Sequence, residues 1–172
     1  MTDFSQLPAR GPDGATHVVV ETPRGMTSKV KFDPKLGAFR FSRSLKLGLR
    51  YPYDWGFVPG TLAPDGDPLD AMILYDMTGF PGLVVPCRAV GLIEIDQEER
   101  GRRFRNDRVL FAPAKGAEVT LEENERRSIE RFFCDAVADT EKFLHVLGWR
   151  GAEVAEAEVE RCCNRFRKQA AE

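Results

Sequence analysis

The sequence is poor in histidine and cysteine and contains no long hydrophobic run. It has 172 residues with 2 histidines and 4 cysteines, and no cysteine pair has C-x-x-C spacing, so a Cys/His zinc site is not expected. No apolar stretch approaches the roughly 20 residues that span a bilayer. Residues Met1 to Arg10 carry neither a basic region nor an apolar core. We therefore expect no secretory signal and a cytoplasmic protein with reduced thiols.

Net charge is also nearly absent. The chain has 25 basic and 27 acidic residues, a formal net charge of −2, which argues against a protein that binds nucleic acid or an anionic membrane through bulk charge. The sequence has no P-loop and no G-x-G-x-x-G motif. With 42% hydrophobic residues and no repeat or linker, the composition predicts one globular domain over residues 1–172.

The charges that are present are strongly segregated. Between Arg24 and Arg50, Asp33 is the only acid among eight basic residues. From Tyr51 to Cys87 there is no lysine or arginine, but there are five aspartates. Solvated surfaces usually mix the two signs, so this separation indicates a site for charged ligands.

The hydrophobic pattern predicts strands first and helices last. Short strands are expected around residues 18–20, 29–32, 39–41, 71–75, 83–95 and 109–111, with a turn over 33–37 and a bend or bulge at Gly91. Alternation along residues 29–32 would place Lys29 and Lys31 on one face. A capping box over residues 120–123 begins one helix, and a second is expected over 152–168 with Val154, Val159, Cys162 and Phe166 inward. This order predicts an α+β fold, a small barrel or curled sheet with helices packed on it.

The segment Asp65-Gly66-Asp67-Pro68-Leu69-Asp70 is the most distinctive local motif. Asp, Gly and Pro are the usual turn residues, so a plain turn is the first interpretation. An EF-hand loop is excluded, because Leu69 and Asp70 stand where that loop needs Asp or Asn and then Gly. Three aspartates in six residues repel one another unless they are solvated or neutralised by a cation such as Mg²⁺, Mn²⁺ or Ca²⁺.

The basic hairpin beside this acidic segment favours the metal interpretation. Divalent cations on the aspartates and the side chains of Lys29 and Arg43 can together hold a highly anionic ligand, of which phosphates are the commonest. Two metals a few Å apart can activate a water molecule and stabilise the leaving oxygens, and a further carboxylate can serve as general base.

These residues resemble the soluble (family I) inorganic pyrophosphatases. The similarity rests on residues 51–57 and on the D-x-D-P-x-D signature at 65–70, and it extends from about Val18 to Pro113. It implies an OB-like five-stranded β-barrel with flanking C-terminal helices, and Mg²⁺-dependent hydrolysis of diphosphate to two phosphates. It also implies a homo-oligomer, commonly a hexamer in bacteria. Mn²⁺ or another divalent metal is an alternative to Mg²⁺.

The resemblance also implies roles for single residues. Asp67 would be the general base, and Tyr51 would line the site and tune the attacking water. The phosphate contacts would be Lys29, Arg43 and Arg108. The metal ligands and their outer partners would be Asp65, Asp70, Asp96, Asp107 and Glu21, with Asp107 standing in for Asn106.

Several positions depart from the family pattern. Lys31 stands where the family has Glu, Trp55 where it has Tyr, and Asn106 where it has a metal-binding Asp. Arg108 replaces a phosphate-binding Lys, and Ala136-Val137 replaces a phosphate-binding Tyr-Lys pair. The arginines at 100, 102, 103 and 105 either replace those cations, fit a larger phosphate compound, or form a solvated turn. Two alternatives therefore stay open: hydrolysis of another phosphoanhydride, and a non-catalytic protein that binds a phosphate ligand.

Overall fold

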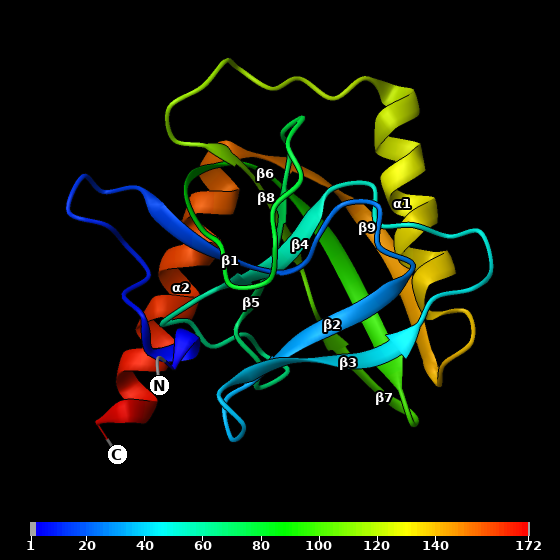
Figure 1. Ribbon diagram of the computed structural model, residues 1–172, viewed down its shortest axis with the longest axis horizontal. Coiled ribbons are helices and arrows are strands. Elements are labelled where there is room, and N and C mark those ends of the chain that lie inside the picture. The colour runs from blue at the N-terminus through cyan, green and yellow to red at the C-terminus, as the bar shows by residue number, and fades with distance from the viewer. Residues whose placement is uncertain (1–2, 172) are drawn as a thin grey trace.

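The computed structural model describes residues 3–171, and its centre is a closed ring of five strands (Figure 1). The ring runs in the order β1, β4, β5, β8 and β6, and pairing of β1 with β6 closes it. Neighbouring strands in the ring are antiparallel, except that β5 and β8 are parallel. The five strands are β1 (Thr16–Thr22), β4 (Asp54–Val58), β5 (Leu69–Ile73), β6 (Val84–Glu99) and β8 (Arg108–Pro113).

The remaining elements are attached to this ring. Strands β7 (Arg102–Arg105) and β9 (Lys142–Gly151) pair with the far half of β6, and β2 (Ser28–Asp33) and β3 (Ala38–Ser44) form a separate hairpin. The helices are α1 (Glu123–Val137) and α2 (Ala152–Ala170), with a short 3-10 turn, η1, at Phe4–Gln6. Figure 1 shows α1 and α2 on opposite sides of the sheet. Neither helix is long and apolar enough to cross a membrane.

Alternation along the strands builds a separate core under each helix. On β5, Ala71 and Ile73 pack with Val159 of α2, whereas Met72 packs with Phe133 of α1. Because side chains two residues apart share a face, Asp70 lies on the α1 side with Met72. The same rule places Arg108 on that side with Leu110 of β8. The fold thus brings an aspartate of β5 and an arginine of β8 to one face.

The structure confirms the α+β barrel, the basic hairpin and the bulge at Gly91, which falls between Ala89 and Gly91 in the β6–β8 register. The strand predicted around residues 39–41 is β3 at Ala38–Ser44. The strand predicted at 71–75 is β5 at Leu69–Ile73, which begins two residues earlier than predicted.

Some expectations were wrong. Helix α1 is preceded by Glu122, whose N–H donates to the Glu125 side chain at 2.8 Å, so the capping box begins two residues after Thr120. Val154 is 41% exposed, although it was predicted to point inward.

Two segments that were not predicted as strands form strands. Residues 142–151 form β9 and not a break between the two helices, because they pair with β6, which is distant in sequence. The arginine-rich segment forms the β6–β7 hairpin, whose turn places Arg100 and Gly101 at positive φ.

Candidate active site

The aspartate motif is a tight loop that leads into β5. The Thr61 hydroxyl donates to the carbonyl of Val58 and accepts from the N–H of Leu69, which joins both ends of the loop. Gly66 has φ +90°, a left-handed conformation that glycine adopts without strain. The N–H of Asp67 donates to Asp65 Oδ1 at 3.1 Å. The loop therefore presents Asp65 and Asp67 to solvent beside the half-buried Asp70.

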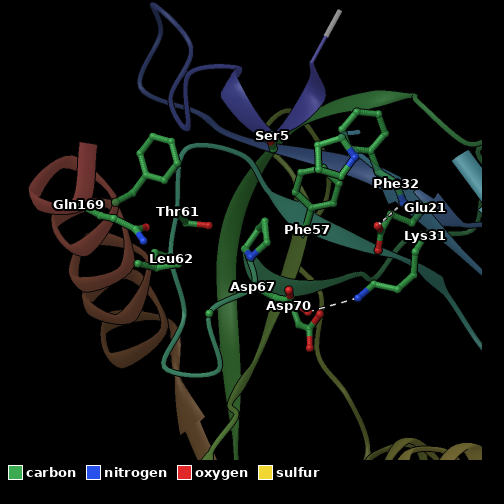
Figure 2. Close-up of a pocket in the computed structure, with 14 residues that line it drawn as sticks. Ser5, Glu21, Lys31, Phe32, Phe57, Thr61, Leu62, Asp67, Asp70 and Gln169 are labelled. Atoms are coloured by element: carbon green, nitrogen blue, oxygen red, sulfur yellow. Dashed lines mark hydrogen bonds and ion pairs between the residues drawn. The ribbon is translucent and has the colours of Figure 1, made fainter. Parts of the chain in front are cut away.

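A cavity of about 300 Å³, here called the acidic cavity, lies against this loop (Figure 2). Figure 2 shows Glu21, Lys31, Asp67 and Asp70 together on one side of it. The opposite wall is contributed by the loop and the end of α2 and includes Leu62 and Gln169. The lining residues are Ser5, Glu21, Lys31, Phe32, Pro34, Phe57, Thr61, Leu62, Gly66, Asp67, Pro68, Asp70, Phe166 and Gln169.

Glu21 is the buried carboxyl group of the acidic cavity. It is only 5% exposed, and it accepts a 2.7 Å hydrogen bond from the N–H of Phe32. Burial raises the pKa of Glu21 to about 7, although the Phe32 hydrogen bond and the nearby Lys29 and Lys31 act in the opposite direction. Near neutral pH the carboxyl group of Glu21 is therefore partly protonated.

Lys31 forms an ion pair with the predicted general base. Its Nζ lies 3.2 Å from Asp67 Oδ2. Burial opposes the charge of Lys31, but the attraction of Asp67 and of Glu21 outweighs it and raises the pKa of Lys31. Lys31 therefore stays positively charged beside the carboxylates of Glu21 and Asp67.

A second, smaller cavity of about 40 Å³ contains the predicted phosphate contacts and is called the cationic cavity. Lys29 and Arg43 reach it from the β2–β3 hairpin, and Arg108 reaches it from β8. Arg43 also donates to the carbonyl of Ala136 near the end of α1. Burial lowers the pKa of Lys29 to about 8, in spite of the opposing attraction of Asp70. The residues lining this cavity are Lys29, Arg43, Tyr51, Trp55, Arg108, Phe132, Phe133, Ala136, Val137 and Leu144.

Two N–H groups at the cationic cavity are buried without a partner. In the described part of the chain, Trp55 Nε1 and Arg108 Nε are the buried side-chain nitrogens or oxygens that make no hydrogen bond. Unsatisfied buried donors are costly, and they call for an explanation such as a missing anion or water. Tyr51 adds a neutral hydroxyl, because burial raises its pKa far above neutral. The cavity is therefore suited to bind an anion.

Arg108 connects the two cavities. Its Nη1 lies 2.6 Å from Asp70 Oδ2 and donates to the carbonyl of Asn106 at 2.9 Å. Its guanidinium group also lies 5.5 Å from the ring centroid of Trp55. A ligand that spans both cavities would contact a carboxylate cluster at one end and cations at the other.

Asp96 and Asp107 do not join the aspartate loop. Asp107 accepts three hydrogen bonds from Arg105 and one from the N–H of Ile95, and Asp96 lies 2.8 Å from Arg103. Asp107 lines a different cavity, under α2, because adjacent residues point to opposite faces and Arg108 takes the α1 side. In residues 3–171, no three His, Cys, Asp or Glu side chains are arranged to hold a metal ion. Of the five residues predicted to hold metal ions, Glu21 and Asp70 line the acidic cavity, whereas Asp65, Asp96 and Asp107 are not among its lining residues.

The sequence interpretation missed Gln97. It is 3% exposed, and its Oε1 accepts a 3.0 Å hydrogen bond from Nδ2 of Asn106. Ile95, two residues before it, is buried, so alternation along β6 offered a signal that Gln97 and not Asp96 points inward. The contribution of Phe166 and Gln169 to the acidic cavity was also missed, since only the tertiary fold brings α2 to the loop.

The five-stranded barrel, the aspartate loop and the adjoining cationic cavity define a class of enzymes that hydrolyse acid anhydrides of phosphate. A family model described as inorganic pyrophosphatase matches residues 18–167. An inorganic pyrophosphatase of Synechocystis is 34% identical over 96% of this chain and 99% of its own length. One of Streptomyces coelicolor is 37% identical over 88% of this chain and 96% of its own length.

Solved structures agree with the sequence relatives. The crystal structure of inorganic pyrophosphatase from Thermus thermophilus superimposes with a TM-score of 0.87 at 33% identity, covering 96% of this chain and 99% of the other. This chain belongs to the inorganic pyrophosphatase family. The departures in its site are therefore departures within that family.

Proposed function

We propose that this protein hydrolyses inorganic diphosphate to two phosphates with the help of a divalent cation, and that it does so in the cytoplasm. The observation that carries the proposal is the cationic cavity, which is lined by Lys29, Arg43 and Arg108 beside the aspartate loop and adjoins two buried N–H donors that have no partner within residues 3–171. One phosphate of the substrate would take these donors, and the other would lie toward Asp65 and Asp70.

The aspartate loop fits one divalent cation. Asp65 and Asp70 each have an oxygen that accepts no hydrogen bond within the described residues, and Mg²⁺ and Mn²⁺ prefer carboxylate oxygens. When bound, the cation would stabilise phosphoryl oxygens and lower the pKa of a coordinated water. Glu21, at the wall of the same cavity, would hold water molecules around it.

The protein's own groups perform the remaining steps of the proposed reaction. Asp67 accepts a proton from the attacking water, whose oxygen forms a bond to one phosphorus as the bridging P–O bond breaks. Lys31 pairs with Oδ2 of Asp67, which leaves Oδ1, with no hydrogen-bond partner in the described residues, to take the proton. Lys29, Arg43 and Arg108 hold the leaving phosphate and offset its increased charge.

Phosphate release from diphosphate with Mg²⁺ tests the proposal. Asp67→Asn is expected to lower kcat by about 10²-fold or more while the fold is retained. Asp76→Asn removes an exposed carboxylate of the same acidic segment outside both cavities, so it is expected to leave kcat unchanged. No phosphate release with Mg²⁺, Mn²⁺, Zn²⁺ or Co²⁺ would refute the proposed activity.

The apolar end of the acidic cavity favours a second candidate substrate. Phe32, Phe57 and Phe166 line it beyond the carboxylates, in space that diphosphate does not need. A phosphoanhydride with an organic substituent would bury that substituent there. A higher kcat/KM on a nucleoside diphosphate or triphosphate than on diphosphate would favour this candidate. Tight binding of imidodiphosphate with no turnover of any substrate would instead indicate a binding protein.

A further inference from the structure

Two carboxylates of the aspartate loop form ion pairs with side-chain cations of the protein. Lys31 Nζ lies 3.2 Å from Asp67, and Arg108 Nη1 lies 2.6 Å from Asp70. The side chain of Arg108 is 8% exposed, so its ion pair is well shielded from water. Both cations come from strands and not from mobile loops. Asp67 and Asp70, two of the four carboxylates formed by the aspartate loop and Glu21, thus already pair with cations of the protein.

Two neutral amide side chains, those of Asn106 and Gln97, are buried near Arg108. They add no negative charge that could offset Lys31 and Arg108. Asn106 and Gln97 are 5% and 3% exposed, and their amides hydrogen-bond to each other. Arg108 also donates to the Asn106 carbonyl. An amide pair satisfied in this way supplies no anionic ligand to a second divalent cation.

We propose that this site takes a single divalent cation, at Asp65 and Asp70, and that Lys31, together with the neutral amide pair of Asn106 and Gln97, excludes a second one. The inference deepens the proposed function, and it rests on that function for the role of the cation. The Lys31 ammonium lies beside Asp67 and supplies positive charge that a second metal ion would otherwise bring to the substrate's phosphoryl oxygens.

Electrostatics favours one cation over two. Glu21, Asp65, Asp67 and Asp70 offer at most four negative charges, and two divalent cations would match all of them. With Lys31 already paired in the same group and Arg108 on Asp70, a second divalent cation would be repelled or would have to displace one of them. Displacing Arg108 would leave a buried guanidinium without its partner, which is strongly unfavourable.

Titration of the metal-free protein with Mn²⁺ alone, followed by the electron paramagnetic resonance signal, counts the sites directly. We expect one equivalent of bound Mn²⁺ per chain and a spectrum without coupling between neighbouring manganese ions. Two equivalents with affinities within about tenfold of each other, a coupled spectrum, or no bound Mn²⁺ would overturn the inference.

The double variant Lys31→Glu/Asn106→Asp restores negative charge at both places. It is expected to gain a second Mn²⁺ site with at least about tenfold higher affinity than any second site of the wild type, because Coulomb interactions at these distances amount to more than a tenfold change in binding. Lys35→Glu/Asn164→Asp makes the same change in charge at exposed positions and is expected to gain none. A stable double variant without the second site would contradict the role of Lys31. If that variant does not fold, the wild-type count decides alone.

Failure of this inference is distinguishable from failure of the proposed function. Diphosphate hydrolysis by a protein that binds two Mn²⁺ ions would refute the single-cation site and leave the activity standing. One bound Mn²⁺ without hydrolysis of diphosphate would refute the activity and leave the single-cation site standing.

Discussion

At the scale of single residues, Glu21 shows how burial couples the site to stability. The pKa of this carboxyl group is raised from 4.5 to about 7 by burial. Between these two pH values the unfolded chain releases the proton and the folded chain keeps it. Stability from this group is therefore present at low pH and is lost as the pH rises toward 7.

Glu21→Gln removes this dependence, since the amide does not ionise. In metal-free buffer, the unfolding free energy of the variant relative to the wild type is expected to rise by about 1–3 kcal/mol between pH 4.5 and pH 8. Urea unfolding at the two pH values measures it, with the exposed Glu118→Gln as control. A constant difference between variant and wild type would contradict the buried, protonated carboxyl group.

Trp55 is expected to contribute both to the stability of the fold and to anion binding, and the two effects can be measured separately. Trp55 is 4% exposed and its indole N–H has no partner in the described residues, so Trp55→Phe is expected to lower the unfolding free energy by about 1–2 kcal/mol through lost packing and not through a lost hydrogen bond. The same change is expected to weaken imidodiphosphate binding about fivefold to tenfold, because it removes a donor to the anion. Calorimetry of binding and of unfolding measures both effects.

Trp149 provides the matched control for that experiment. Its indole N–H donates to Glu130, so Trp149→Phe is expected to lower the unfolding free energy by about 1 kcal/mol and to leave anion binding unchanged. Unchanged binding in Trp55→Phe would mean that the indole faces no ligand.

At the scale of elements, the β1–β4 pair depends on one glycine. A Cβ at Gly56 would lie 1.8 Å from the carbonyl oxygen of Val19, far inside contact distance. Gly56→Ala is therefore expected to destabilise the protein by more than about 3 kcal/mol and to disturb the barrel beside Trp55. Thermal or urea unfolding measures the loss.

Gly151→Ala is the control for backbone freedom, because a Cβ at Gly151 would meet no other atom within 4 Å. Its expected cost is about 1 kcal/mol or less, from the preference for glycine over alanine before a helix. Similar losses in both variants would show that the close approach of Val19 does not matter.

The elements differed in how well the sequence predicted them. The β2–β3 hairpin was predictable, since its turn residues and alternation are local. Strand β9 was not, because its stability comes from nine register partners on β6, which lies far earlier along the chain. Glycines at 148 and 151 made the same segment look like a break between helices.

At the scale of the whole molecule, the remaining prediction is assembly into a homo-oligomer. Strand β9 presents Phe143 and Leu147, 65% and 50% exposed, on one face of the sheet. Light scattering after gel filtration is expected to give a multiple of 19.3 kDa, six chains by family resemblance. Phe143→Ser/Leu147→Ser is expected to lower that mass, because exposed apolar pairs of this kind favour association.

Leu47→Ser is the control, since Leu47 is fully exposed outside the strands. It is expected to leave the mass unchanged. A wild-type mass of one chain would contradict the predicted assembly.

The sequence by itself determined the α+β class, the aspartate loop and the basic hairpin, because these depend on alternation, turn residues and segregated charge, all of which are local. Closure of the sheet into a barrel depends on the pairing of β1 with β6, and from the sequence it was implied only by the family resemblance. Only the tertiary structure decided which charges meet. Pairing of β5 with β8 sets Arg108 against Asp70 and turns Asp107 toward α2, and the pairing of β6 and β8 lets Gln97 meet Asn106. The packing of the β2–β3 hairpin against the aspartate loop sets Lys31 against Asp67. Which face a residue takes depends on register, and register is fixed by partners far along the chain.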